Sequence, residues 1–369
     1  MSLIYPEYQF NFKPRIWLSY VGAFIFFTIL PIAGIWFSGK DISPYLQFPP
    51  ITKYVVHAPK NLSIFLIGLT GVFLAIFPFV RRLFFTRPII IFKKRYPFPK
   101  WGIVGLFLMI FSWLLAWGHF KDLSWLRPYY FAPLWLGFII FINAITFTKK
   151  GTCVMVSNKF RFLMLFPIST IFWWYFEFLN RFVQNWHYIG VESFSSTEYV
   201  FIASISFSTV LPAIISVFEF LKETINLKGA FGNFYRLQIK NSKLLAGLFL
   251  ISSALGMFFL GIYPDVLFPL LWLSPLIILI SFQVLSNVET IFSKISYGDW
   301  EDIVALSLSG LFCGFFWEMW NFYSYPKWIY LIPYVSHFKI FEMPLLGYAG
   351  YLPFGLECGA LLNNYFNSK

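Results

Sequence analysis

Apolar residues occur in blocks of about twenty along most of this chain, and this pattern constrains the fold more than any other feature. A helix needs about 20 apolar residues to cross a bilayer core of roughly 30 Å. A soluble domain would have shorter amphipathic segments and about a quarter of its residues charged. Here 12% of the residues are charged and 59% are hydrophobic. The sequence therefore predicts an all-α, multi-pass integral membrane protein.

We expect ten membrane-spanning helices, with boundaries that can shift by several residues. The first apolar run is too long for the core of a cleavable signal and long enough to span the membrane. So many spans in 369 residues leave little room for a separate soluble domain. The spans are predicted at about 16–37, 62–80, 101–119, 129–147, 162–180, 198–221, 244–262, 264–284, 303–320 and 343–362.

Basic residues are distributed unevenly between the predicted loops. If the N-terminus is cytoplasmic, the inner segments carry 20 of the 28 Lys and Arg residues and the outer segments carry 8. The positive-inside rule then predicts a protein of the cytoplasmic (inner) membrane with both termini in the cytoplasm. The net charge of +12 lies in short loops, which favours membrane lipids as partners and not nucleic acid.

Motifs for nucleotides, metals and cofactors are missing from the sequence. There is no Walker loop, no Gly-rich dinucleotide motif, no nucleophile elbow and no kinase motif. The three cysteines and four histidines have no metal-ligand spacing. We therefore expect neither a cofactor nor a metal site.

Two segments of the chain resemble each other at the ends of the fifth and ninth predicted spans. They read WYFEFLNRFVQNWHY and FFWEMWNFYSYPKWIY. Aligned on Glu177 and Glu318, each has an aromatic residue before the Glu and an Asn three residues after it, Asn180 and Asn321. A Trp-x-Tyr motif follows in both, at Trp186 to Tyr188 and at Trp328 to Tyr330.

A second pair of similar segments lies upstream, where FAPLWL and FPLLWL precede the respective Glu by similar distances. We interpret the pattern as two parallel four-helix repeats, 101–243 and 244–369. Residues 1–100 are then an N-terminal two-helix addition with a basic cytoplasmic loop. Chance similarity between aromatic-rich spans is the alternative.

Glu177 and Glu318 are candidate catalytic residues because an ionisable group within a membrane helix is energetically costly. Asn180 and Asn321 share a helix face with them and are predicted to orient their carboxyl groups. Burial in an aromatic wall favours a neutral acid that can donate a proton. The structural alternative is that each Glu only supports packing between the repeats.

Glu357 is a further catalytic candidate, deep in the last predicted span or at its inner end. Its neighbours include several Pro and Gly residues, which predict an irregular or closely packed helix. Membranes tolerate such a helix where it is buried in protein or lines a cavity.

Aromatic residues around the two Glu residues are predicted to form the walls of a binding site. Aromatic faces can stabilise a cation by about 0.5–2 kcal/mol each. The same residues could equally line a pocket for an apolar ligand without chemistry. The candidate wall residues are Trp174, Trp186, Tyr188, Trp317, Trp320, Trp328 and Tyr330.

The order of these motifs resembles that of the membrane-embedded carotenoid-modifying proteins, the lycopene cyclase domain and carotenoid hydratase type. The resemblance lies in Glu318, in Trp328 to Tyr330 and in KIFEMPLLGY, with a weaker copy after Glu177. It implies non-redox chemistry on a polyene, with acidic residues as proton donors. The Pro-x-Glu-Glu motif of those cyclases is absent, and the repeat here has four helices instead of three.

These features predict a protein that binds a lipid-soluble, isoprenoid-like molecule and acts on it by acid–base chemistry. One alternative is a proton-coupled transporter or channel, which predicts a polar path through the membrane. Another is a non-catalytic scaffold or subunit of a membrane complex, in which both Glu faces are plugged by packing or point outward. The sequence does not specify the oligomeric state.

Overall fold

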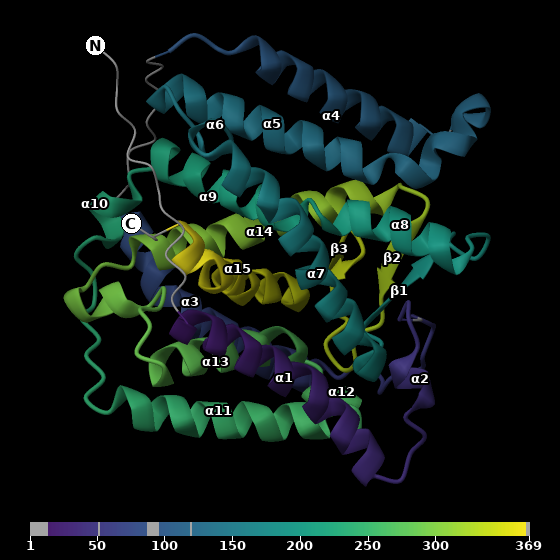
Figure 1. The fold of residues 1–369 in the computed structure, drawn as a ribbon, viewed down its shortest axis with the longest axis vertical. Helices are drawn as coiled ribbons and strands as arrows, with labels where there is room; N and C mark the ends of the chain where they lie inside the picture. Colours follow the sequence, from purple (N-terminus) through teal and green to yellow (C-terminus); the bar gives the residue numbers. More distant parts are fainter. Residues whose placement is uncertain (1–13, 51, 87–95, 119, 367–369) are drawn as a thin grey trace.

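The computed structural model describes residues 14–50, 52–86, 96–118 and 120–366, and most of this part of the chain is helical (Figure 1). Within the described residues, nine of the predicted spans coincide with helical segments of sufficient length and apolarity to cross a membrane. These segments are Tyr20–Phe37, Leu62–Thr86, Lys100–Gly118, Phe131–Lys150, Lys159–Val183, Ser196–Thr224, Ser242–Phe259, Glu301–Phe322 and Leu345–Leu362. The prediction of a multi-pass helical membrane protein is thereby confirmed.

The remaining predicted span, 264–284, is divided between two helices. A turn at Tyr263 leads into α12 (Pro264–Leu267), and α13 (Leu270–Leu285) follows with 16 residues. At about 1.5 Å per residue such a helix rises roughly 24 Å, which is short of a bilayer core of about 30 Å. The count of ten crossings stays a prediction.

One span is interrupted where it is buried, between α8 (Ser196–Phe207) and α9 (Val210–Thr224). The interruption frees backbone groups that lipid cannot satisfy. Ser169 of the neighbouring helix α7 (Lys159–Val183) binds both of them. Its hydroxyl donates to the carbonyl oxygen of Phe207 at 2.6 Å and accepts from the backbone N–H of Leu211 at 3.0 Å.

The last span is irregular, as the sequence predicts. It begins with the 3₁₀ segment η3 (Leu345–Gly350) and continues as α15 (Tyr351–Phe366). This helix approaches α14 (Glu301–Phe322) closely, since a Cβ atom on Gly355 would lie 2.1 Å from the carbonyl oxygen of Leu306.

The helices form one packed bundle (Figure 1), in which α14 is largely buried and α3 (Leu62–Thr86) is largely exposed. Among the described spans, α14 has 61% of its length buried inside the protein and α3 has 6%, the lowest value. On one side of the bundle, α4 (Lys100–Gly118) packs on α5 (Phe131–Lys150), α5 packs on α9, and α9 packs on α7 and α14. On the other side, α14 packs on α15, α15 packs on α13, and α13 packs on α1 (Pro14–Phe37) and α11 (Ser242–Phe259).

Short elements cap the two ends of the bundle (Figure 1). The end with α6 (Val154–Ser157), α10 (Leu227–Phe231) and η2 (Ser293–Tyr297) contains the connections 148–161, 222–243 and 285–302, which are predicted to be inner. The opposite end contains α2 (Ser43–Leu46), η1 (Lys121–Tyr129), β1 (Trp186–Ile189), β2 (Lys327–Tyr330), β3 (Lys339–Ile340) and β4 (Met343–Pro344). Successive spans therefore cross the bundle in alternating directions.

Candidate functional site

A two-stranded antiparallel ribbon joins the ends of α7 and α14. In it, Trp186 of β1 lies opposite Tyr330 of β2, and Tyr188 lies opposite Trp328. Alternate residues of a strand point to the same face, so these four aromatic residues share one face of the ribbon. The two Trp-x-Tyr motifs are therefore brought together by strands, an arrangement that the sequence pattern did not predict.

The two asparagines hold this ribbon by its backbone. Asn180 donates from its amide nitrogen to the carbonyl oxygen of Trp186 at 2.8 Å and accepts from the backbone N–H of Asn185 at 2.8 Å. Asn321 donates to the carbonyl oxygen of Trp328 at 2.8 Å and accepts from its backbone N–H at 3.0 Å. The prediction that each Asn directly orients its Glu is therefore wrong, because these hydrogen bonds extend from the helix end to the next strand.

Glu177 is buried, and one of its oxygens accepts hydrogen bonds from three aromatic side chains. The hydroxyl of Tyr188 donates to Oε1 at 2.6 Å, and the indole nitrogens of Trp173 and Trp186 donate to the same atom at 3.1 and 3.2 Å. The other oxygen, Oε2, is buried without a hydrogen-bond partner among the residues described.

Glu318 is buried in a similar arrangement. The hydroxyls of Tyr330 and Tyr351 donate to its Oε1 at 2.7 and 2.6 Å. The indole nitrogen of Trp328 donates to the Tyr330 hydroxyl at 3.0 Å and so extends the network by one step. Here too Oε2 is buried and has no hydrogen-bond partner in the described part of the chain.

The two ribbon tyrosines, Tyr188 and Tyr330, stay protonated and act as donors. Burial raises the pKa of each phenol well above its ordinary value, and the adjacent carboxyl group raises it further. Each phenol can therefore pass a proton only in a concerted step with its Glu, since an isolated phenolate would be unfavourable in this environment.

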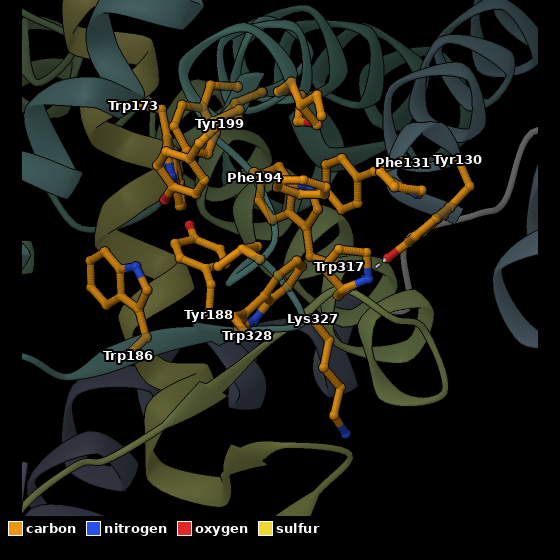
Figure 2. Close-up of a pocket in the computed structure, with 18 of the residues that line it drawn as sticks. Tyr130, Phe131, Trp173, Trp186, Tyr188, Phe194, Tyr199, Trp317, Lys327 and Trp328 are labelled. Atoms are coloured by element: carbon orange, nitrogen blue, oxygen red, sulfur yellow. Dashed lines mark hydrogen bonds between the residues drawn. The ribbon is translucent and has the colours of Figure 1, made fainter. Parts of the chain in front are cut away.

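One cavity of about 140 Å³ receives aromatic residues from both networks (Figure 2). Figure 2 shows Trp173, Tyr188 and Tyr199 gathered on one side of it, with Phe131 and Trp317 on the other. The two Glu residues lie behind this aromatic wall. The full lining is Pro128, Tyr130, Phe131, Trp173, Trp186, Tyr188, Val191, Phe194, Tyr199, Ile202, Ala203, Ser206, Phe207, Val210, Trp272, Trp317, Pro326, Lys327, Trp328, Tyr330 and Tyr351.

Five of the seven predicted wall residues line this cavity: Trp186, Tyr188, Trp317, Trp328 and Tyr330. Trp174 and Trp320 lie outside it, so the prediction is wrong for these two. Trp174 faces α8 and donates to the hydroxyl of Ser204 at 2.9 Å. Trp320 is completely buried and packs against Trp135, with ring centroids 4.9 Å apart.

Several residues that line the cavity are not among the seven predicted wall residues. Trp173 immediately precedes the predicted Trp174, and only the rotation of α7 decides which of the two faces the cavity. Tyr199 and Tyr351 come from α8 and α15, and no spacing in the sequence connects them to the Glu residues. Trp272 could have been found, because it belongs to the FPLLWL segment of the predicted repeat.

Glu357 belongs to a different place in the bundle. Only 3% of the residue is exposed, its Oε2 has no hydrogen-bond partner among the described residues, and it does not line the aromatic cavity. Tyr175 of α7 also has a buried hydroxyl without a hydrogen-bond partner in the part described. The structure therefore does not bring Glu357 together with Glu177 and Glu318.

Equivalent tryptophans pack across the bundle onto the residue that precedes each Glu. Trp272 stacks on Phe176 at 5.3 Å, and Trp135 lies 5.0 Å from Trp317, measured between ring centroids. Trp272 also lies 5.6 Å from Trp186. The segments FAPLWL and FPLLWL thus each contact the other predicted repeat.

Known proteins offer no assignment. Comparisons with protein families, curated proteins and solved structures found no match. Within the described residues no group of three or more His, Cys, Asp or Glu side chains could hold a metal ion. The functional inference therefore rests on the two acids and the cavity they share.

Proposed function

We propose that this protein binds a lipid-soluble, isoprenoid-like molecule in the aromatic cavity and acts on it by non-redox acid–base chemistry. The observation that carries the proposal is that the tyrosines bonded to Glu177 and Glu318 line the same cavity. Mostly apolar walls with a few convergent polar groups are typical of small-molecule sites. The isoprenoid class follows the resemblance to carotenoid-modifying proteins.

In the proposed reaction the phenols transfer protons between the acids and the ligand. On one side a neutral carboxyl gives its proton to the phenol oxygen while the phenol gives its own to a ligand carbon. On the other side a ligand C–H proton passes to the second phenol, which gives its proton to a carboxylate. One C–H bond forms, another breaks, and no oxidant is needed. Either Glu177 or Glu318 can take either role.

The internal repeat is part of the proposal and is supported by paired features. Each unit contains a Glu, an Asn that binds the following Trp backbone, and a strand that pairs with its counterpart. The helix pairs α4–α5 and α7–α9 correspond to α11–α13 and α14–α15. Units 101–243 and 244–369 with an addition at 1–100 describe this arrangement.

For location we propose the cytoplasmic membrane, with both termini and the α10 end of the bundle in the cytoplasm. Basic residues concentrated in the connections at that end support this orientation. The aromatic cavity is then near the outer leaflet.

Proton-coupled transport is the second candidate, and the observation that favours it is Glu357. A buried acid without a hydrogen-bond partner in the described part of the chain suits a proton site. Transport requires a polar path from Glu357 to the aromatic cavity. Large aromatic residues pack around Phe354 instead: Phe172, Phe176, Trp173, Trp272 and Trp317. A scaffold role is less favoured because Glu177 and Glu318 both support the wall of a cavity.

The test is lipid extraction and mass spectrometry of purified protein, comparing wild type with the Glu177→Gln/Glu318→Gln double variant. Glu198→Gln is the matched control, because Glu198 is exposed in a capping box that Gln also satisfies. We expect a co-purifying isoprenoid-like lipid that is chemically changed by wild type and by the control, and unchanged with the double variant. Recovery of bulk membrane lipid alone from all three proteins would contradict the proposal.

A further inference from the structure

The hydrogen-bonding partners of Glu177 and Glu318 are unusual for buried acids. All the hydrogen bonds that the structure shows to their Oε1 atoms come from cavity aromatics, either from phenol hydroxyls or from indole N–H groups. Among the residues described, no Lys, Arg or His forms an ion pair with either carboxyl group. A buried charge usually has such a partner.

This arrangement has a direct electrostatic consequence for the cavity. The face of an aromatic ring is the negative part of its quadrupole, and its edge is positive. A carboxylate that accepts a hydrogen bond from the edge of a ring increases the electron density of that ring. Trp173, Trp186, Tyr188, Tyr330 and Tyr351 are all held in this way, so each acid makes the aromatic wall more negative when its carboxyl group is ionised.

Among the described residues of the lining, Lys327 is the one cationic side chain, and it does not cancel this potential. Lys327 contributes its stem to the cavity, and its amino group points away from the aromatic cluster in Figure 2. That amino group donates to the carbonyl oxygen of Phe322 at 3.2 Å and forms an ion pair with Glu342. The cavity therefore has two acids behind its wall and no positive side-chain group directed into it among the described residues.

We infer that the aromatic cavity binds a positively charged carbon- or nitrogen-centred group attached to an apolar chain. The inference rests on the proposed ligand site and makes its specificity more definite: the centre is cationic, not merely apolar. Two sources share this chemistry. The ligand is either a permanent onium lipid, or a neutral alkene on which positive charge develops after protonation.

The test compares two probes of equal shape and different charge. One is dodecyltrimethylammonium, and the other is its neutral carbon isostere with a tert-butyl head. Binding to the full-length protein in dodecyl maltoside is followed by quenching of tryptophan fluorescence, since five tryptophans line the cavity: Trp173, Trp186, Trp272, Trp317 and Trp328. We expect the wild type to bind the ammonium probe at least about tenfold more tightly than the isostere.

Variants separate the effect of the acids from general partitioning into micelles. Glu177→Gln/Glu318→Gln is expected to lose the preference for the ammonium probe and to keep its affinity for the isostere, while Glu198→Gln behaves as wild type. If the double variant does not fold, the single variants Glu177→Gln and Glu318→Gln are each expected to lose part of the preference. Tyr188→Phe, which retains the ring but removes its contact with Glu177, is expected to do the same.

The outcomes distinguish this inference from the proposed function. Equal affinity of wild type for both probes, or an ammonium preference that survives in the double variant, overturns the cationic specificity while ligand binding stands. Failure of both probes to bind overturns both. Mass spectrometry of the bound lipid then separates the sources: an unchanged onium lipid identifies a permanent cation, and a converted neutral lipid identifies a cationic reaction intermediate.

Discussion

Asn321→Ala tests whether the ribbon that carries the aromatic wall is held by one buried amide. In the wild type that side chain satisfies both backbone groups of Trp328, the carbonyl oxygen at 2.8 Å and the N–H at 3.0 Å. Asn321 is completely buried, so water cannot easily replace it. Each orphaned buried group costs about 1–3 kcal/mol, which gives about 2–6 kcal/mol in total. At about 2 °C per kcal/mol, a value suited to larger chains, the thermal midpoint falls by about 4–12 °C.

The cysteines of the chain provide the assay. Cys153, Cys313 and Cys358 are all free and buried, so a thiol-reactive fluorogenic maleimide reports unfolding on heating in detergent. Asn241→Ala is the matched control, because Asn241 is exposed and its side chain makes no capping hydrogen bond. A midpoint for Asn321→Ala within about 1 °C of this control would refute the reasoning, since the predicted loss is several times larger.

Three further predictions concern the bundle. Gly355→Leu is expected to lower the thermal midpoint strongly in the same assay, because even its Cβ would lie 2.1 Å from the carbonyl oxygen of Leu306. The control Gly247→Ala has open space around its Cβ and should be neutral or slightly stabilising. Ser169→Ala should cost about 2–6 kcal/mol, because it orphans two backbone groups at the α8–α9 interruption, the carbonyl oxygen of Phe207 and the N–H of Leu211. The cost is measured against a Ser208→Ala control at an exposed hydroxyl. Tags inserted in 81–100 and after the last residue should report the same side of the membrane; opposite sides would contradict the even number of crossings.

The chemical elements of the site could be found from the sequence because they repeat. Glu177 and Glu318 were found from their cost in a membrane helix and from the Asn that follows each of them three residues later. That spacing correctly places Asn and Glu on one helix face, but it does not reveal what the face meets. Each Asn binds the backbone of the next strand, and each Glu binds the side chains that the strand presents.

Which residues line the cavity could not be predicted in the same way. Trp173 and Trp174 are adjacent tryptophans, and nothing in the sequence distinguishes them. Neighbouring helix positions differ by a rotation of about 100°, so Trp173 lines the cavity and Trp174 contacts Ser204. Tyr351 lies 33 positions after Glu318, and the two meet only because α15 packs closely on α14 through glycine.

Length and apolarity of the segments are local properties, and a bilayer imposes the same requirement on every span, so the helical membrane architecture follows directly from the order of residues. The aromatic cavity depends on contacts between segments far apart in the chain. Pairing of β1 with β2 brings residues 186–189 and 327–330 together, and no local preference specifies that pairing. Packing geometry therefore decides which rings connect to the acids, and through them what kind of ligand the cavity accepts.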